Sequence, residues 1–131
     1  MKTARTLLIV LALTVSAGMI LGSEPAPSYS RDIEPLFLAA CGNCHGAERP
    51  KKGLDLSAGR GRAALVGVAS RSEPQFVLVK AGDPDGSYLW KKLEHATAKG
   101  KGMPRTLFGA SKLPADQLAV IRAWIAAGAP E

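Results

Sequence analysis

The segment Cys41-Gly-Asn-Cys44-His45 constrains this chain more than any other feature of its sequence. Two cysteines separated by two residues and followed directly by a histidine can hold a c-type haem, because both sulfurs bond to the porphyrin edge while the imidazole binds the iron. These are the only cysteines of the chain, and no second motif of this kind follows. The motif therefore predicts one covalent haem c as the cofactor.

Three other interpretations of the two cysteines stay open. A redox-active Cys-x-x-Cys usually opens a helix in a βαβ unit, whereas the helical spacing of apolar residues places Cys41 and Cys44 at the end of a helix. A structural zinc site needs four ligands, and His45 and His95 are the only histidines that could complete one, with His45 awkwardly adjacent to Cys44. A disulfide is the default for a cysteine pair in an exported protein. Haem attachment is favoured over all three.

The N-terminal residues have the order of a secretory signal peptide. Lys2 and Arg5 precede a mostly apolar run over residues 7–21, and small residues follow it. This run is shorter than the roughly 20 residues that a membrane-spanning helix needs. We therefore expect residues 1–23 to be a signal peptide, with an uncleaved anchor as the alternative. The expected location is the periplasm or another extracytoplasmic compartment, with membrane contact only if this segment stays uncleaved.

The chain length of 131 residues suits one domain. Residues 24–30 are expected to form a linker, and residues 31–131 are expected to form the domain that carries the haem. The predicted fold is all-α, with a few helices around one covalently bound haem. Residues 76–79 predict a short extended stretch, and residues 96–109 predict a loop. The expected helices cover residues 32–44, 57–66, 87–95 and 114–127.

One methionine remains once the predicted signal peptide is set aside. Met1 and Met19 lie within that segment, so Met103 is the only candidate for a thioether ligand in the mature chain. It stands between a glycine and a proline, which can present the sulfur rigidly from a loop. We expect Met103 to bind the iron on the side opposite His45, with His95 as the alternative ligand.

The axial pair decides what the iron can do. Methionine is a soft and weakly donating ligand that favours ferrous iron, so His/Met ligation raises the reduction potential. With both axial positions filled, neither oxygen nor a substrate has an open site on the metal. The sequence therefore predicts a one-electron carrier and not an enzyme. The alternative is a haem-based ligand-binding or sensor protein with a labile distal ligand.

Charge narrows the choice of partners. The chain has a formal net charge of +6, but its basic residues are not interleaved with aromatics, which form only 5% of the composition. Nucleic-acid binding is therefore not expected. Cations that flank the two predicted ligand loops could steer acidic redox proteins toward the haem, or could simply be solvated or compensate haem propionates. These cations are Arg49, Lys51, Lys52, Lys99, Lys101 and Arg105.

Taken together, the motifs resemble the planctomycete-type cytochrome c domain, a branch of the small class I cytochromes c. The resemblance covers most of residues 29–129 in family order. The matching segments are residues 33–36, 41–46, 52–57, 81–87, 102–104 and 118–129, together with Leu89.

This resemblance implies a cytochrome c-like, all-helical fold around one haem, with the first and last helices crossing. It also implies that Cys41 and Cys44 attach the haem and that His45 and Met103 are the proximal and distal ligands. The chain departs from the family where the last helix begins, since leucine precedes Pro114 in place of the more usual serine or threonine.

Overall fold

The structure is a computed structural model that describes residues 24–97 and 99–131. The predicted signal peptide over residues 1–23, with Met1 and Met19, lies outside the described residues. Among the helices that are described, none has both the length and the apolar character needed to cross a membrane.

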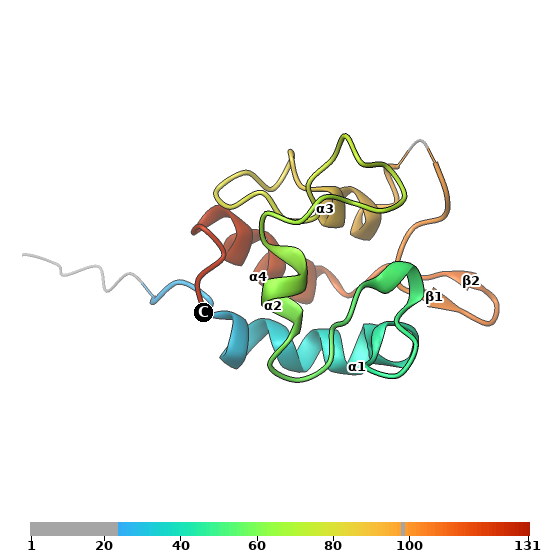
Figure 1. Ribbon diagram of the computed structural model, residues 1–131. Helices are drawn as coiled ribbons and strands as arrows, with labels where there is room; N and C mark the ends of the chain where they lie inside the picture. Colours follow the sequence, from blue (N-terminus) through green and yellow to red (C-terminus); the bar gives the residue numbers. More distant parts are fainter. Residues whose placement is uncertain (1–23, 98) are drawn as a thin grey trace, which may run out of the picture.

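Helices dominate the described part of the chain (Figure 1). The two longest, α1 and α4, have 12 residues each. In chain order the elements are the π-helix η1 (Tyr29–Ile33), α1 (Glu34–His45), the 3₁₀ turn η2 (Lys51–Gly53), α2 (Gly61–Leu65), α3 (Tyr88–Leu93), β1 (Arg105–Thr106), β2 (Gly109–Ala110) and α4 (Ala115–Ala126).

The first helical segment begins earlier than the sequence predicts. Asp32 is a good N-cap residue, but Ser28 takes that position, and its hydroxyl accepts a hydrogen bond from the backbone N–H of Arg31 at 3.4 Å. The Asp32 carboxylate accepts in return from the Ser28 N–H at 2.8 Å. This reciprocal cap moves the start to Tyr29, which the expected linker included and which is only 2% exposed.

The last helix follows its prediction closely. Pro114 serves as the N-cap, one residue before the helix proper. At the other end Gly128 adopts φ 93°, the left-handed conformation that glycine reaches without a steric cost. The N–H groups of Gly128 and Ala129 donate to the carbonyls of Ile125 and Trp124, which closes the helix as a Schellman motif.

The prediction of an all-α fold is wrong, because the structure also contains β pairing. Strands β1 and β2 form an antiparallel pair with Arg105 opposite Ala110 and Thr106 opposite Gly109. Apart from Ala110, this hairpin lies within residues 96–109, which were expected to be a loop. Two isolated bridges, Val66 with Val79 and Ala69 with Val77, add further pairing and confirm the extended stretch at residues 76–79. The fold is therefore mixed, with helices and a small sheet.

Sequence patterns do not predict the hairpin, because its turn lacks the residues that usually mark one. Two-residue hairpin turns favour Asn-Gly or Asp-Gly, whereas here the turn is Leu107-Phe108. The Thr106 hydroxyl supplies the closure instead. It donates to the Gly109 carbonyl at 3.1 Å and accepts from the Phe108 N–H at 3.3 Å.

Tyr29 joins the two ends of the domain at the centre of the core. Its ring packs against Trp124 of α4 and Phe37 of α1, with centroid separations of 5.6 and 6.3 Å. Its backbone N–H donates to the Pro130 carbonyl at 3.0 Å, and the Trp124 indole donates to the same oxygen at 2.8 Å. The other fully buried side chains of this core include Ile33, Leu56, Leu65, Val79, Leu93, Ile121 and Ile125.

The Tyr29 hydroxyl generates a stability prediction. It is buried with no hydrogen-bond partner among the described residues, and this burial raises the pKa of Tyr29 to about 12. A Cβ atom on Gly61 would overlap this hydroxyl. Gly61→Ala should therefore lower the free energy of unfolding by about 1–3 kcal/mol. Tyr29→Phe should restore most of that loss when combined with it.

The matched control is Gly42→Ala, at a helical glycine where an added Cβ meets nothing within 4 Å. It should stabilise by up to about 1 kcal/mol, in line with alanine's higher helix propensity. Urea unfolding of the single and double variants measures both effects. Additive effects of Gly61→Ala and Tyr29→Phe would contradict the proposed overlap.

Candidate functional site

Cys41 and Cys44 lie in the last turn of α1. Their three-residue separation puts both side chains on the same side of the helix. Both are free thiols and half-buried. Burial, and secondarily the nearby Cys44, raises the pKa of Cys41 to about 11. A redox-active cysteine needs a lowered thiol pKa, which helix N-termini help to provide, so this environment disfavours the thioredoxin-like interpretation.

His45 is the last residue of α1, and the backbone holds it firmly. Its carbonyl accepts a hydrogen bond from the Leu56 N–H at 2.7 Å, which closes the loop that follows the helix. Gly46 then leaves the helix in an extended conformation. A Cβ at Gly46 would press on the Gly42 carbonyl oxygen, so the chain can exit at this point because position 46 has no side chain.

The His45 imidazole is half-buried and incompletely paired. Its Nδ1 atom is buried and has no hydrogen-bond partner within the described parts of the chain. Burial lowers the pKa of His45, and the neighbouring backbone of Leu54 and Lys51 opposes that shift. A neutral imidazole with a free ring nitrogen is the form in which histidine binds a metal.

Lys92 of α3 organises the loop that carries Met103. Its backbone carbonyl accepts a hydrogen bond from the Met103 N–H at 2.9 Å. Its ammonium donates to the carbonyls of Lys99 and Lys101 at 3.0 and 3.3 Å, and to the Thr97 hydroxyl at 3.3 Å. One lysine therefore fixes the loop from both its backbone and its side chain, while Met103 itself stays half-buried.

His95 braces the same loop from the end of α3. It has φ 61°, and the helix closes around it as a Schellman motif in which Ala96 N–H donates to the Lys91 carbonyl. Its Nε2 lies 3.2 Å from the Met103 carbonyl oxygen, a hydrogen bond when Nε2 carries the proton. A Cβ on Gly102 would overlap the His95 ring, so glycine permits this close approach.

The structure thus forms two separate clusters from the predicted site residues. Cys41, Cys44 and His45 share one helical turn, and His95 contacts Met103. No hydrogen bond or ion pair links the two clusters in the described ranges. In the view of Figure 1, the C-terminal end of α1 and the β1–β2 hairpin that follows the Met103 loop lie toward the same end of the molecule.

The residues around the first cluster fit a covalently attached haem. Across residues 24–97 and 99–131, no three His, Cys, Asp or Glu side chains converge on one metal position. A thioether-linked haem would not need such convergence, because the two sulfurs would bond the porphyrin edge and His45 alone of this cluster would bind the iron. Apolar side chains that the core covers only partly would suit the porphyrin faces. Ala40, which directly precedes Cys41, is one such side chain beside the motif.

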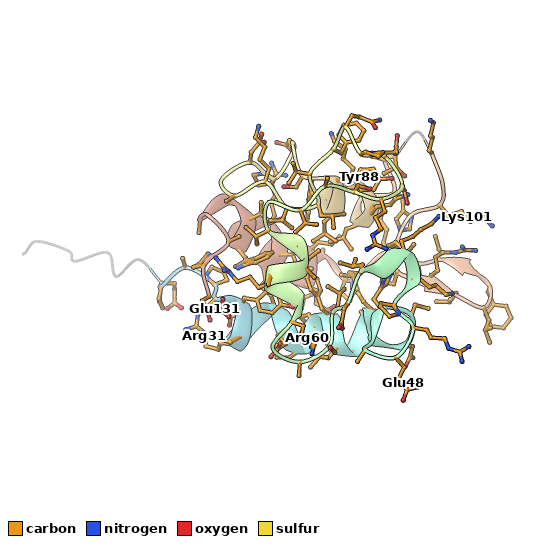
Figure 2. All side chains as sticks on the ribbon, in the orientation of Figure 1. Arg31, Glu48, Arg60, Tyr88, Lys101 and Glu131 are labelled. Atoms are coloured by element: carbon orange, nitrogen blue, oxygen red, sulfur yellow. The ribbon has the colours of Figure 1, made fainter. Side chains whose placement is uncertain are left out.

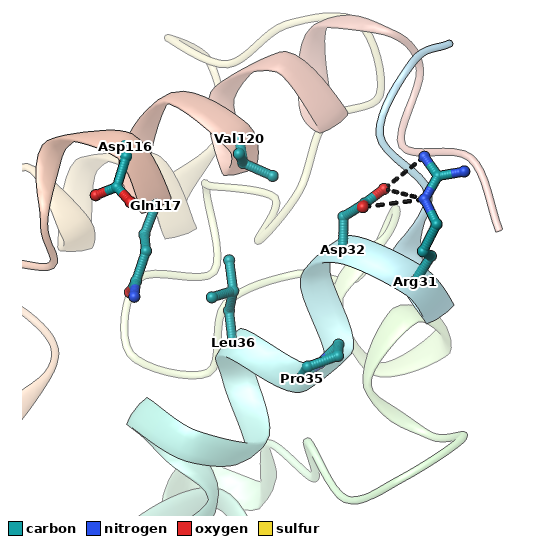
Figure 3. A pocket seen from close by; sticks show the side chains of 7 residues that line it. All are labelled: Arg31, Asp32, Pro35, Leu36, Asp116, Gln117 and Val120. Atoms are coloured by element: carbon teal, nitrogen blue, oxygen red, sulfur yellow. Dashed lines mark hydrogen bonds and ion pairs between the residues drawn. The ribbon is translucent and has the colours of Figure 1, made fainter. Parts of the chain in front are cut away.

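A groove of about 430 Å³ lies elsewhere, between α1 and α4 (Figure 3). An exposed ion pair between Arg31 and Asp32, with a 2.8 Å separation, forms one wall. None of the predicted site residues lines this open groove, so it is distinct from the candidate site. Its lining consists of Arg31, Asp32, Pro35, Leu36, Asp116, Gln117 and Val120.

The sequence analysis missed Lys92 as part of the site. A lysine at the end of a short helix has the pattern of a solvated residue, and nothing in the sequence predicts that its ammonium turns back onto the carbonyls of Lys99 and Lys101. The Gly102–Met103–Pro104 segment signals a tight turn, but not the histidine that packs against it.

Comparison with family models, curated proteins and solved structures finds no match to this chain.

The Lys92 contacts predict a local change in loop stability. Lys92→Met keeps the aliphatic stem and removes three hydrogen bonds, so trypsin should cleave after Lys99 and Lys101 about tenfold faster. The control is Lys91→Met, because the neighbouring Lys91 makes none of these bonds. Mass spectrometry of timed digests measures the rates. Equal cleavage in the two variants would show that the ammonium does not hold the loop.

Proposed function

We propose that this chain is an exported one-electron carrier with a single haem c, attached through Cys41 and Cys44 and ligated by His45 and Met103. The observation that carries the proposal is the last turn of α1, where two half-buried thiols adjoin an imidazole with an unpaired, buried Nδ1. The resemblance to planctomycete-type cytochrome c domains supports the same assignment from the sequence.

The haem, when bound, supplies an iron couple whose reduction potential depends on the two axial ligands. Cys41 and Cys44 fix the orientation of the group relative to α1. His45 stays in place because its backbone closes the loop to Leu56. An imidazole that binds a metal usually donates its other ring N–H to a nearby acceptor. The backbone of Leu54 and Lys51, which raises the pKa of His45, would be that acceptor here.

Met103 supplies a neutral sulfur from a braced loop. Lys92 and His95 both hold its backbone, which reduces the freedom of the side chain to leave a ligand position. A distal ligand that stays in place denies oxygen and small substrates access to the metal. This bracing supports electron transfer over the alternative, a ligand-binding or sensor protein whose distal ligand dissociates.

The partners that suit this function are redox proteins, acidic ones among them. The six cations predicted to surround the haem are all exposed, which leaves their charges available to steer a partner. They are Arg49, Lys51, Lys52, Lys99, Lys101 and Arg105. We propose no catalytic residue and no binding of nucleic acid.

Haem attachment is tested by producing the chain in a host that exports proteins and attaches haem c. The purified protein should show a Soret band that survives acidic acetone extraction, because thioether bonds resist it. The double variant Cys41→Ala/Cys44→Ala should show no Soret band after the same extraction. Asn43→Ala changes the exposed residue between the cysteines and should keep the band. A wild-type protein without a Soret band would favour a zinc or disulfide module instead.

The distal ligand is tested by spectroscopy and redox titration. Met103→Ala should abolish the methionine–iron charge-transfer band of the oxidised protein and lower the potential by on the order of 100 mV. His95→Ala should keep the band, because the hydrogen bond of His95 goes to the backbone carbonyl of Met103 and not to its sulfur. The reverse pattern would make His95 the ligand. Rapid, stoichiometric carbon monoxide binding by the reduced wild type would favour the sensor function.

A further inference from the structure

The tip of the β1–β2 hairpin exposes two large apolar side chains. Leu107 is 99% exposed and Phe108 is 100% exposed. The other exposed large hydrophobics, Leu38 and Val68, are only 41% and 38% exposed, so the core still covers much of each. The hairpin projects from the body of the molecule in Figure 1. Complete exposure of two adjacent side chains of this size leaves considerable apolar surface in water.

The hairpin presents this pair in a defined conformation. The Thr106 hydroxyl bonds on both sides of the turn, to the Gly109 carbonyl and to the Phe108 N–H. At the base the Ser111 N–H donates to the Pro104 carbonyl at 3.0 Å. These bonds hold Leu107 and Phe108 outward and leave them no partner within the hairpin.

The surrounding segment carries only positive charge. Residues 99–112 contain Lys99, Lys101, Arg105 and Lys112, and no acidic residue. All four are exposed, and the Lys112 ammonium lies 3.7 Å from the Glu94 carboxylate. In the view of Figure 2, Lys101 lies toward the same end of the molecule as the hairpin. An apolar tip within a cationic segment complements a surface that is anionic outside and apolar just beneath.

We propose that this hairpin docks the protein on an anionic lipid bilayer, with Leu107 and Phe108 inserted at the interface and the cations on lipid headgroups. A protein partner would need a pocket shaped for a protruding tip, whereas a fluid bilayer admits one without a preformed pocket. Aromatic and aliphatic side chains favour the headgroup boundary, and nearby lysines and arginines add attraction to anionic lipid. The residues that carry this docking all lie within residues 99–112.

The test measures binding of the purified, exported protein to sedimenting vesicles. Equimolar phosphatidylglycerol and phosphatidylcholine should bind it more tightly than phosphatidylcholine alone. Leu107→Gln/Phe108→Gln should weaken binding to the anionic vesicles at least about tenfold, since each side chain loses an apolar transfer energy. The matched control, Leu38→Gln/Val68→Gln, should change binding less than twofold. Thermal unfolding confirms that each variant folds.

Charge is tested in parallel. Lys99→Gln/Lys101→Gln should weaken binding by about fivefold for each charge removed. Arg60→Gln/Lys80→Gln removes two exposed cations outside residues 99–112 and should have little effect. If the N-terminal segment itself anchors the protein, total binding does not report on the hairpin, so lipid contact is also measured at the hairpin by photolabelling. Phe108→p-benzoylphenylalanine should photolabel anionic lipid, and Val68→p-benzoylphenylalanine should not.

Three results would overturn the docking. They are equal binding to both kinds of vesicle, unchanged binding by Leu107→Gln/Phe108→Gln, and equal lipid labelling from positions 108 and 68. If that double variant instead lost a salt-sensitive complex with an acidic protein, the hairpin would be a protein-docking element. None of these measurements uses haem absorbance, so their failure leaves the proposed electron-carrier function standing, and the reverse also holds.

Discussion

The packing of Tyr29 against Trp124 determines where the candidate site can lie. This contact ties η1 to α4, and the Pro130 carbonyl accepts hydrogen bonds from both residues. Because η1 continues directly into α1, the position of Tyr29 also sets the direction of the longer helix. The turn with Cys41 and Cys44 stands at the far end of that helix. Its orientation therefore depends on aromatic packing at the opposite end of α1.

Sequence patterns succeeded where the determining interaction is local. The cysteines do end a helix, and Gly128 does close the last one, because spacing and a left-handed glycine act over a few residues. The all-α prediction failed at the hairpin, since the Thr106 hydroxyl closes a turn that has no conventional turn residues. The start of η1 was misplaced because Asp32 suits an N-cap, although it instead completes a cap on Ser28. The haem assignment itself rests on the motif, and the contacts of Lys92 depend on tertiary structure that no spacing encodes.

The short helix α3 matters mainly through its last turn. Tyr88 and Leu93 bury α3 in the core, while Lys92 and His95, the latter lying two residues beyond the helix, contact the Met103 loop. His95 occupies a position where glycine is the usual residue, and a non-glycine side chain there carries a conformational cost. The ring compensates by packing on Gly102 and reaching the Met103 carbonyl. The unusual backbone conformation of His95 thus coincides with contacts that support the Met103 loop.

The hydrogen bond between the Tyr29 N–H and the Pro130 carbonyl has a consequence for how such a domain can be combined with others. It brings the two ends of the folded unit within one hydrogen bond of each other. A domain whose ends meet can be inserted into a surface loop of a host protein without separating the two sides of that loop. The same adjacency allows new termini to be opened elsewhere, with a short peptide joining the original ones. The turn with Cys41 and Cys44 would then move with the unit, because the contacts described for it, such as the hydrogen bond from Leu56 to His45, lie between residues 29 and 130.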